Sequence, residues 1–117
     1  MAFIEDKHGG WRETKTSAAN TALQIVTNDP GDGSCVRVDK VTLSVSGATS
    51  GTDILFTIKD GSTVIWTEYV NALRGQALNL DFIKPLLGSA STAVTFDVAA
   101  GGASAVTTLN VSGDYKG

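Results

Sequence analysis

The 117-residue chain has twelve acidic and nine basic side chains, a formal net charge of −3, one histidine and one cysteine. This length predicts about one domain, and the negative charge gives no electrostatic reason to bind nucleic acid or anionic lipid. No apolar run approaches the roughly 20 residues that cross a bilayer, and the charged start, MAFIEDKH, is unlike a secretory signal. We therefore expect a chain made in a cytoplasm, with neither a membrane nor a nucleic acid as its partner.

The charged fraction is low for a small domain. Asp, Glu, Lys and Arg make up 18% of the residues, whereas about 25% is typical. A small domain has a large surface, so the shortage of charge favours coverage of that surface by other protein, in an oligomer or a lattice. The alternative is a monomeric β domain with a Ser/Thr-rich surface.

The first twenty residues differ from the rest of the chain. Most of the local charge is here, Gly9-Gly10 interrupts any regular element, and neither the strand period nor the helix period is sustained. We interpret residues 1–20 as an N-terminal arm and residues 21–117 as the domain. The arm is too apolar for a solvated tail, so we expect it to pack on the domain or on a partner. Its candidate partner contacts are Phe3, Ile4, Trp11 and Arg12.

The domain begins with two segments of strand character. Residues 23–27 alternate in the manner of a short strand, and residues 28–33 are dominated by turn formers. Alternation resumes over residues 36–45, but its phase switches across Asp39-Lys40. Such a switch predicts a β-bulge, or a bend that moves the strand between sheets.

Residues 56–66, FTIKDGSTVIW, carry the strongest short hairpin signal in the chain. Two alternating apolar runs flank Asp60-Gly61, where we expect the turn. Tyr69 is out of phase with the inward side chains, so it is predicted to be exposed and is a further candidate contact. The side chains predicted to face the core are Phe56, Ile58, Val64 and Trp66.

The remaining strands lie at residues 78–82, 94–98 and 109–111, and Gly101-Gly102 is expected to join the last two as a hairpin. Pro85-Leu86-Leu87-Gly88 is expected to be a loop between strands. Because loops are normally polar, Leu86 and Leu87 should either plug an open end of the domain or meet another chain. The total of seven or eight strands without a helix predicts an all-β antiparallel sandwich, jelly-roll-like or Ig-like.

The sequence offers little for catalysis or for a cofactor. His8 is the only histidine and lies in the predicted arm, where a general base would not be held near a nucleophile. Asp29 and Asp32 lie in a Gly-rich turn but lack the alternating acidic spacing of a calcium loop. There is no phosphate-binding glycine loop. We expect neither an enzyme nor a bound metal or cofactor.

Three stretches carry a resemblance to a known class of proteins. VDKVTLSVSGATSGTDILFTIKDGSTVIW, QALNLDF and STAVTFDVAAGGASAVTTLNVSGDY resemble the small β-sandwich proteins of tailed-phage particles, especially capsid decoration or cement proteins. The resemblance implies a virion structural protein on the capsid exterior that clamps neighbouring capsomers of the major capsid protein, as a homotrimer at threefold positions. The resemblance assigns a role to the chain as a whole and to no individual residue.

Two other classes remain open. A tail, fibre or head-completion component would share the fold but assemble with other symmetry. A carbohydrate-binding or adhesion module would need exposed aromatic side chains, for which Tyr69 is the candidate.

Overall fold

The computed structural model describes residues 4–5, 10–73 and 77–116 of the chain, with the backbone alone for residues 4–5. The described residues form strands and connecting turns. The strands are β1 (Ile4–Glu5), β2 (Trp11–Thr16), β3 (Leu23–Val26), β4 (Cys35–Ser46), β5 (Asp53–Asp60), β6 (Thr63–Asn71), β7 (Leu78–Leu87), β8 (Val94–Val98) and β9 (Val106–Lys116).

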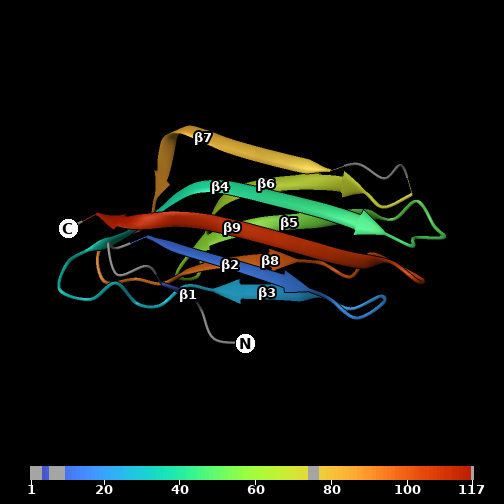
Figure 1. Ribbon diagram of the computed structural model, residues 1–117, viewed down its shortest axis with the longest axis horizontal. Helices are drawn as coiled ribbons and strands as arrows, with labels where there is room; N and C mark the ends of the chain where they lie inside the picture. The colour runs from blue at the N-terminus through green and yellow to red at the C-terminus, as the bar shows by residue number, and fades with distance from the viewer. Residues whose placement is uncertain (1–3, 6–9, 74–76, 117) are drawn as a thin grey trace.

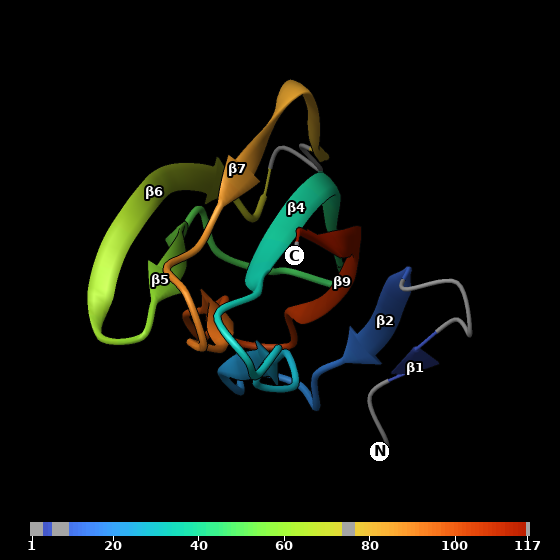
Figure 2. The same ribbon diagram turned by 90° about the vertical axis from the view of Figure 1, so that its left-hand side faces the viewer.

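The strands form two antiparallel sheets that face each other (Figures 1 and 2). Sheet A has the order β1-β2-β9-β4-β7, and sheet B has the order β3-β8-β5-β6. The predicted all-β antiparallel sandwich is confirmed. Without the two-residue β1, each sheet has four of the eight main strands.

The strand order distinguishes between the two sandwich types that the sequence left open. Only β5 and β6 are consecutive in the chain and adjacent in a sheet among the eight main strands, β2 to β9; the other connections cross from one sheet to the other. This alternation is the jelly-roll arrangement, whereas an Ig-like sandwich keeps several consecutive strands in one sheet. The described part of the chain contains no helix long and apolar enough to span a bilayer.

The core lies between the sheets and consists mainly of β-branched and aromatic side chains. The largest fully buried apolar side chains are Phe56, Phe96, Leu43, Ile54, Ile58, Leu109, Val36, Val38, Val41, Val94 and Val98. They come from β4, β5, β8 and β9, the inner strands of the two sheets. Their alternation with exposed or half-buried residues is the period-2 signal of the sequence.

The phase switch in β4 is a bulge, as predicted. Both partners of β4 shift register between Val38 and Lys40, so Val38 and Val41 both face the core although they are three residues apart. The strand stays in sheet A throughout, so the alternative of a sheet change does not apply.

The β5–β6 hairpin exists, but two details of its prediction are wrong. Asp60 pairs with Thr63, which places the turn at Gly61-Ser62, where Gly61 has a φ of 60°. A second bulge lies in β6, because Ile58 pairs with Trp66 whereas Lys59 pairs with Val64. Val64 therefore lies on the outer face and is 48% exposed instead of buried.

The last two strands are not joined as a hairpin. β8 belongs to sheet B and β9 to sheet A, so the turn around Gly101-Gly102 carries the chain from one sheet to the other. A glycine-containing turn has the same local signature whether the strands that it joins pair with each other or with different neighbours.

Two segments that were expected outside the strands lie within sheet A. Trp11–Thr16, assigned to the arm, is β2 and pairs with β9 along its whole length. Leu86 and Leu87, assigned to a loop, end β7 and pair with Val38 and Arg37. In both cases pairing with a distant strand supplies the hydrogen bonds that make the segment a strand, and this pairing has no local sequence signal.

The edges of the sandwich carry features that hinder pairing with other chains. On β2, beyond the two residues that pair with β1, the carboxylate of Glu13 accepts a hydrogen bond from the backbone N–H of Thr14 at 3.0 Å, and Glu13 is 5% exposed. Lys15 Nζ donates to the carbonyl of Gln24 in edge strand β3 at 3.0 Å. Edge strand β7 contains Lys84 and Pro85. Charges and prolines of this kind protect exposed strand edges.

Candidate partner-contact surface

The structure places the predicted contact residues in very different environments. Phe3 lies outside the described residues, and of Ile4 only the backbone is described, which pairs with Arg12. Trp11 is 3% exposed and lies within the core, 6.1 Å from the ring of Phe96 in sheet B. As a buried side chain that bridges the two sheets, Trp11 is not a partner contact.

The other four candidates do not converge on one site. Arg12 is exposed on sheet A, and Tyr69 is 64% exposed on the outer face of sheet B, where it pairs with Leu55. Leu87 is 45% exposed at the end of β7, whereas Leu86 packs partly buried against the core. The exposure of Tyr69 confirms its prediction from strand phase.

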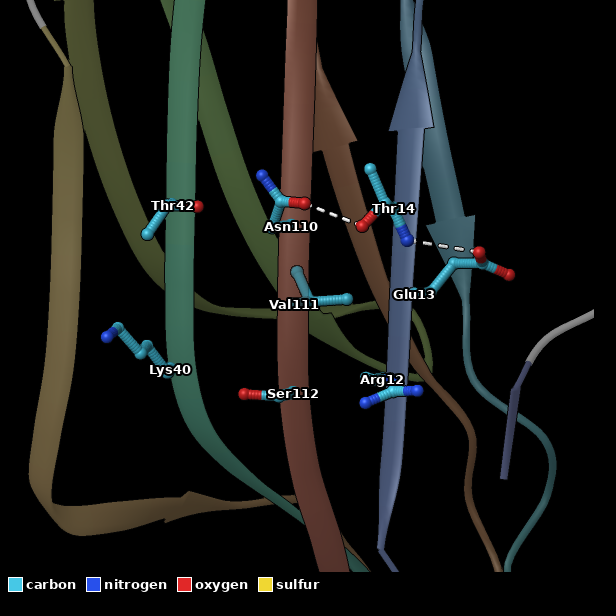
Figure 3. A pocket seen from close by; sticks show the side chains of 8 residues that line it. All are labelled: Arg12, Glu13, Thr14, Lys40, Thr42, Asn110, Val111 and Ser112. Atoms are coloured by element: carbon cyan, nitrogen blue, oxygen red, sulfur yellow. Dashed lines mark hydrogen bonds between the residues drawn. The ribbon is translucent and has the colours of Figure 1, made fainter. Parts of the chain in front are cut away.

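The outer face of sheet A is dominated by hydroxyl and amide side chains arranged in rows across the strands. The register of β2, β9, β4 and β7 places Thr14, Asn110, Thr42 and Asn79 in one row, and Arg12, Ser112, Lys40 and Asp81 in the next. A hollow of about 330 Å³ lies over these rows (Figure 3). We call this hollow the sheet A hollow; it is lined by Arg12, Glu13, Thr14, Lys40, Thr42, Asn110, Val111 and Ser112.

Hydrogen bonds between neighbouring strands order the floor of this hollow. Thr14 Oγ1 donates to Asn110 Oδ1 at 2.6 Å (Figure 3). Outside the hollow, two residues further along β2, the hydroxyls of Thr16 and Thr108 lie 3.2 Å apart. Such cross-strand pairs hold the side chains in fixed orientations. Glu13 lines the hollow too, but its carboxylate bonds the Thr14 N–H on the far side of β2 from Asn110.

Arg12 and Lys40 are the two cations of the sheet A hollow. They flank Ser112 from β2 and β4, both are exposed, and neither forms an ion pair within the described part of the chain. Two other cations of the sheets do have acidic partners: Arg37 pairs with Asp114, and Lys59 Nζ lies 3.1 Å from Asp97. The lining of the sheet A hollow thus contains two cations and one acid, Glu13, on a chain of net negative charge.

Beside this hollow, β7 departs from regular pairing. Asp81 pairs with Lys40 and Leu86 with Val38, so four residues of β7 stand opposite Asp39 alone. The excess forms the sharp corner of β7 in Figures 1 and 2. Within this corner Phe82 packs edge-on against Trp66 with ring centroids 5.2 Å apart, while Ile83 is 100% exposed. Sequence reasoning missed Ile83, because it treated the stretch after Phe82 as a connection.

The outer face of sheet B has a second, shallower hollow of about 730 Å³. Asp97 is one of its lining residues; it accepts a hydrogen bond from Gln24 Nε2 at 2.8 Å and pairs with Lys59 at 3.1 Å. Leu55 lines the same hollow, and its cross-strand neighbour Tyr69 stands exposed beside it. A preordered polar group thus lines this hollow, and an aromatic ring is the cross-strand neighbour of one of its lining residues.

A charged cluster lies next to the β4 bulge. The guanidinium of Arg37 binds the carboxylate of Asp114 through two hydrogen bonds, which raises the pKa of Arg37. The pKa of Asp39 is also raised, chiefly because burial disfavours its charged form, and further because Asp114 and Asp81 repel that charge. Arg37 acts in the opposite direction but does not offset these two causes.

The geometry does not support a cation site at the Asp29–Asp32 turn. Asp29 Oδ1 accepts the backbone N–H of Gly31 at 2.8 Å, as in an ordinary turn. Within the described ranges no group of three or more His, Cys, Asp or Glu side chains is placed to hold a metal ion. His8 lies outside the described residues.

Comparisons with known proteins leave the family of this chain open. No family model matches the sequence, and no curated protein matches it. Among solved structures, the fold is similar to part of dimeric latent PorU from Porphyromonas gingivalis, with a TM-score of 0.46 and 8% sequence identity. The match covers 91% of this chain and 13% of the PorU chain. A likeness this weak carries no argument about function.

Proposed function

We propose that this chain is a non-enzymatic virion structural protein that decorates a phage capsid. In this role it clamps neighbouring capsomers of the major capsid protein, as a homotrimer at threefold positions on the capsid exterior. The proposal starts from the sequence resemblance to capsid decoration proteins, and it draws support from the jelly-roll scaffold, an architecture found in viral capsid domains among others. Since one fold serves many functions, the surface must carry the argument.

The observation that carries the proposal is the corner of β7. Ile83 is fully exposed there, and Leu87 is 45% exposed a few residues later on the same strand. Exposed apolar side chains at a corner of a strand are suited to burial in a partner's surface. A clamp of this kind needs no nucleophile, metal or nucleotide, and multivalent attachment through three copies would strengthen weak individual contacts.

The oligomeric state tests the trimer directly. Light scattering behind size exclusion should give about 36.3 kDa, which is three times the chain mass of 12.1 kDa. A mass of one chain over a wide concentration range would count against a preassembled trimer.

Attachment to the shell tests the decoration role. Capsids from a phage that lacks the gene for this chain should bind the added protein and sediment with it. The Ile83→Ser variant should sediment with far fewer capsids, whereas Val26→Ser, which removes an exposed apolar side chain from sheet B, should bind normally. Equal binding of both variants, or none by the unmodified chain, would refute the proposal.

A second function is favoured by Tyr69 and the hollow of sheet B. An exposed aromatic ring beside an ordered Gln24–Asp97–Lys59 network suits a sugar, which stacks on aromatic rings and bonds to planar polar groups. Under this alternative the chain is a carbohydrate-binding or adhesion module. A glycan array would show specific signals that Tyr69→Ala abolishes, while capsid sedimentation would show nothing.

A further inference from the structure

The lining of the sheet A hollow has more cations than acids, although the chain as a whole is acidic. The chain carries a net charge of −3, yet the cations Arg12 and Lys40 face outward on either side of Ser112. The neighbouring row, Thr14, Asn110, Thr42 and Asn79, consists of threonine and asparagine. The acid in the same row is Asp81 on β7, the direct cross-strand partner of Lys40, while Glu13 bonds a backbone amide of its own strand.

The spacing of these two cations is set by the sheet. Arg12 and Lys40 stand two strands apart in one row, which corresponds to about 9.5 Å between their backbones. Arginine binds carboxylates with two parallel hydrogen bonds, and lysine acts as a point charge. The hydroxyl of Ser112 between them is a further hydrogen-bond donor. Together they fit two carboxylates, or one carboxylate and a carbonyl, on a facing surface.

Ile83 adds an apolar anchor at the border of the same surface. Asp81 ends the row that begins with Arg12, and Ile83 lies two residues after Asp81 in β7. The side chain of Ile83 is 100% exposed. An apolar side chain that enters a partner's pocket, beside charges that set its orientation, is the usual composition of a protein–protein contact.

We propose that the sheet A hollow docks on a carboxylate-rich protein surface, with Arg12 and Lys40 as its charged contacts and Ile83 as its apolar anchor. The inference rests on the proposed function for the identity of the partner, which is then an acidic patch of the capsid protein. Protein carboxylates fit better than nucleic-acid phosphates, because two cations on a net acidic chain give little attraction for a phosphate backbone. The described residues that line the hollow also include no aromatic side chain for base stacking.

The first experiment follows backbone amide signals by NMR while poly-L-glutamate is added to the full chain. Signals of Arg12, Lys40 and Ser112 should shift, and the shifts should weaken as salt screens the exposed charges. Arg12→Gln with Lys40→Gln should weaken binding by about tenfold, the size expected from losing two exposed ion pairs. Arg12→Lys with Lys40→Arg should keep it.

A control of equal charge separates the hollow from general electrostatics. Thr67→Glu with Thr95→Glu changes the net charge by the same −2 on the outer face of sheet B. This control should leave the poly-L-glutamate affinity within about twofold of the unmodified chain. Equal weakening by both double variants, or shifts centred elsewhere, would overturn the inference, as would tighter binding of a 20-base-pair DNA duplex than of poly-L-glutamate.

Capsid sedimentation of the same variants separates this inference from the decoration role. If the unmodified chain and the glutamine double variant bind capsids equally, decoration stands and the acidic docking surface is wrong. If the unmodified chain binds poly-L-glutamate at the hollow but ignores capsids, the docking chemistry stands and the decoration role is wrong.

Discussion

The indole ring of Trp11 lies directly against Gly113, its cross-strand partner in β9. A Cβ at position 113 would lie 2.7 Å from Trp11 Cζ2 and 1.9 Å from the carbonyl oxygen of Arg37. The indole Nε1 donates to the carbonyl of Asp114 at 3.0 Å. Glycine at 113 therefore lets three strands, β2, β9 and β4, approach closely enough for Trp11 to close one end of the core.

Gly113→Ala should destabilise the fold strongly. The backbone oxygen of Arg37 cannot move away without disturbing the β4–β9 pairing, so we expect a loss of about 3 kcal/mol or more. Chemical denaturation measures it. Gly51→Ala is the control, because the nearest atoms to its Cβ are 3.9 Å away; its stability should stay within about 0.5 kcal/mol of the unmodified chain. Similar losses in both variants would contradict this account.

Trp11→Ala should cost about 3 to 5 kcal/mol of unfolding free energy, because it empties a large buried site. Thermal unfolding by circular dichroism would show a correspondingly lower midpoint. Arg12→Ala, one residue away and exposed, should change stability by less than about 0.5 kcal/mol. An equally mild effect of Trp11→Ala would mean that the segment is an arm after all.

Trp66→Phe should be far milder than Trp66→Ala. The indole Nε1 of Trp66 is buried and has no hydrogen-bond partner among the described residues, so phenylalanine removes an unsatisfied donor while keeping an aromatic contact with Phe82. We expect a change of about 1 kcal/mol or less for phenylalanine and about 3 kcal/mol for alanine. The denaturant midpoints of the two variants measure this difference in stability. If Trp66→Phe loses as much stability as Trp66→Ala, the indole N–H has a hydrogen-bond partner and this account is wrong.

Asp39→Asn should stabilise the chain at neutral pH. The pKa of Asp39 is raised in the folded chain, so the folded state favours the protonated form. Once the pH exceeds this raised pKa, the charged carboxylate lowers the free energy of unfolding. The advantage of asparagine should shrink as the pH falls through the raised pKa and vanish below the ordinary value of 3.8. Paired urea titrations at pH 7 and pH 3.5 measure it; a constant difference between the two chains would contradict the assignment.

The candidate surface was only partly readable from the sequence. The strand phase predicted the exposure of Tyr69, and Arg12 is exposed as a partner contact requires. Lys40 and Ser112 became part of the surface only through pairing between β2, β9 and β4. Ile83 is exposed because β7 is longer than the β4 segment that it pairs with, and a mismatch between two strands leaves no signal within either one.

The sequence by itself determined that this protein is built from strands, where most of them lie, and that β4 contains a bulge, because alternation and turn chemistry are properties of a few consecutive residues. Only the tertiary structure decided the jelly-roll order, the membership of Trp11–Thr16 in sheet A and the outward position of Val64. These features depend on which distant strands share hydrogen bonds and on the register in which they do so. One residue of register shift reverses the face of every following side chain, so the surface that meets a partner is set by pairing rather than by local pattern.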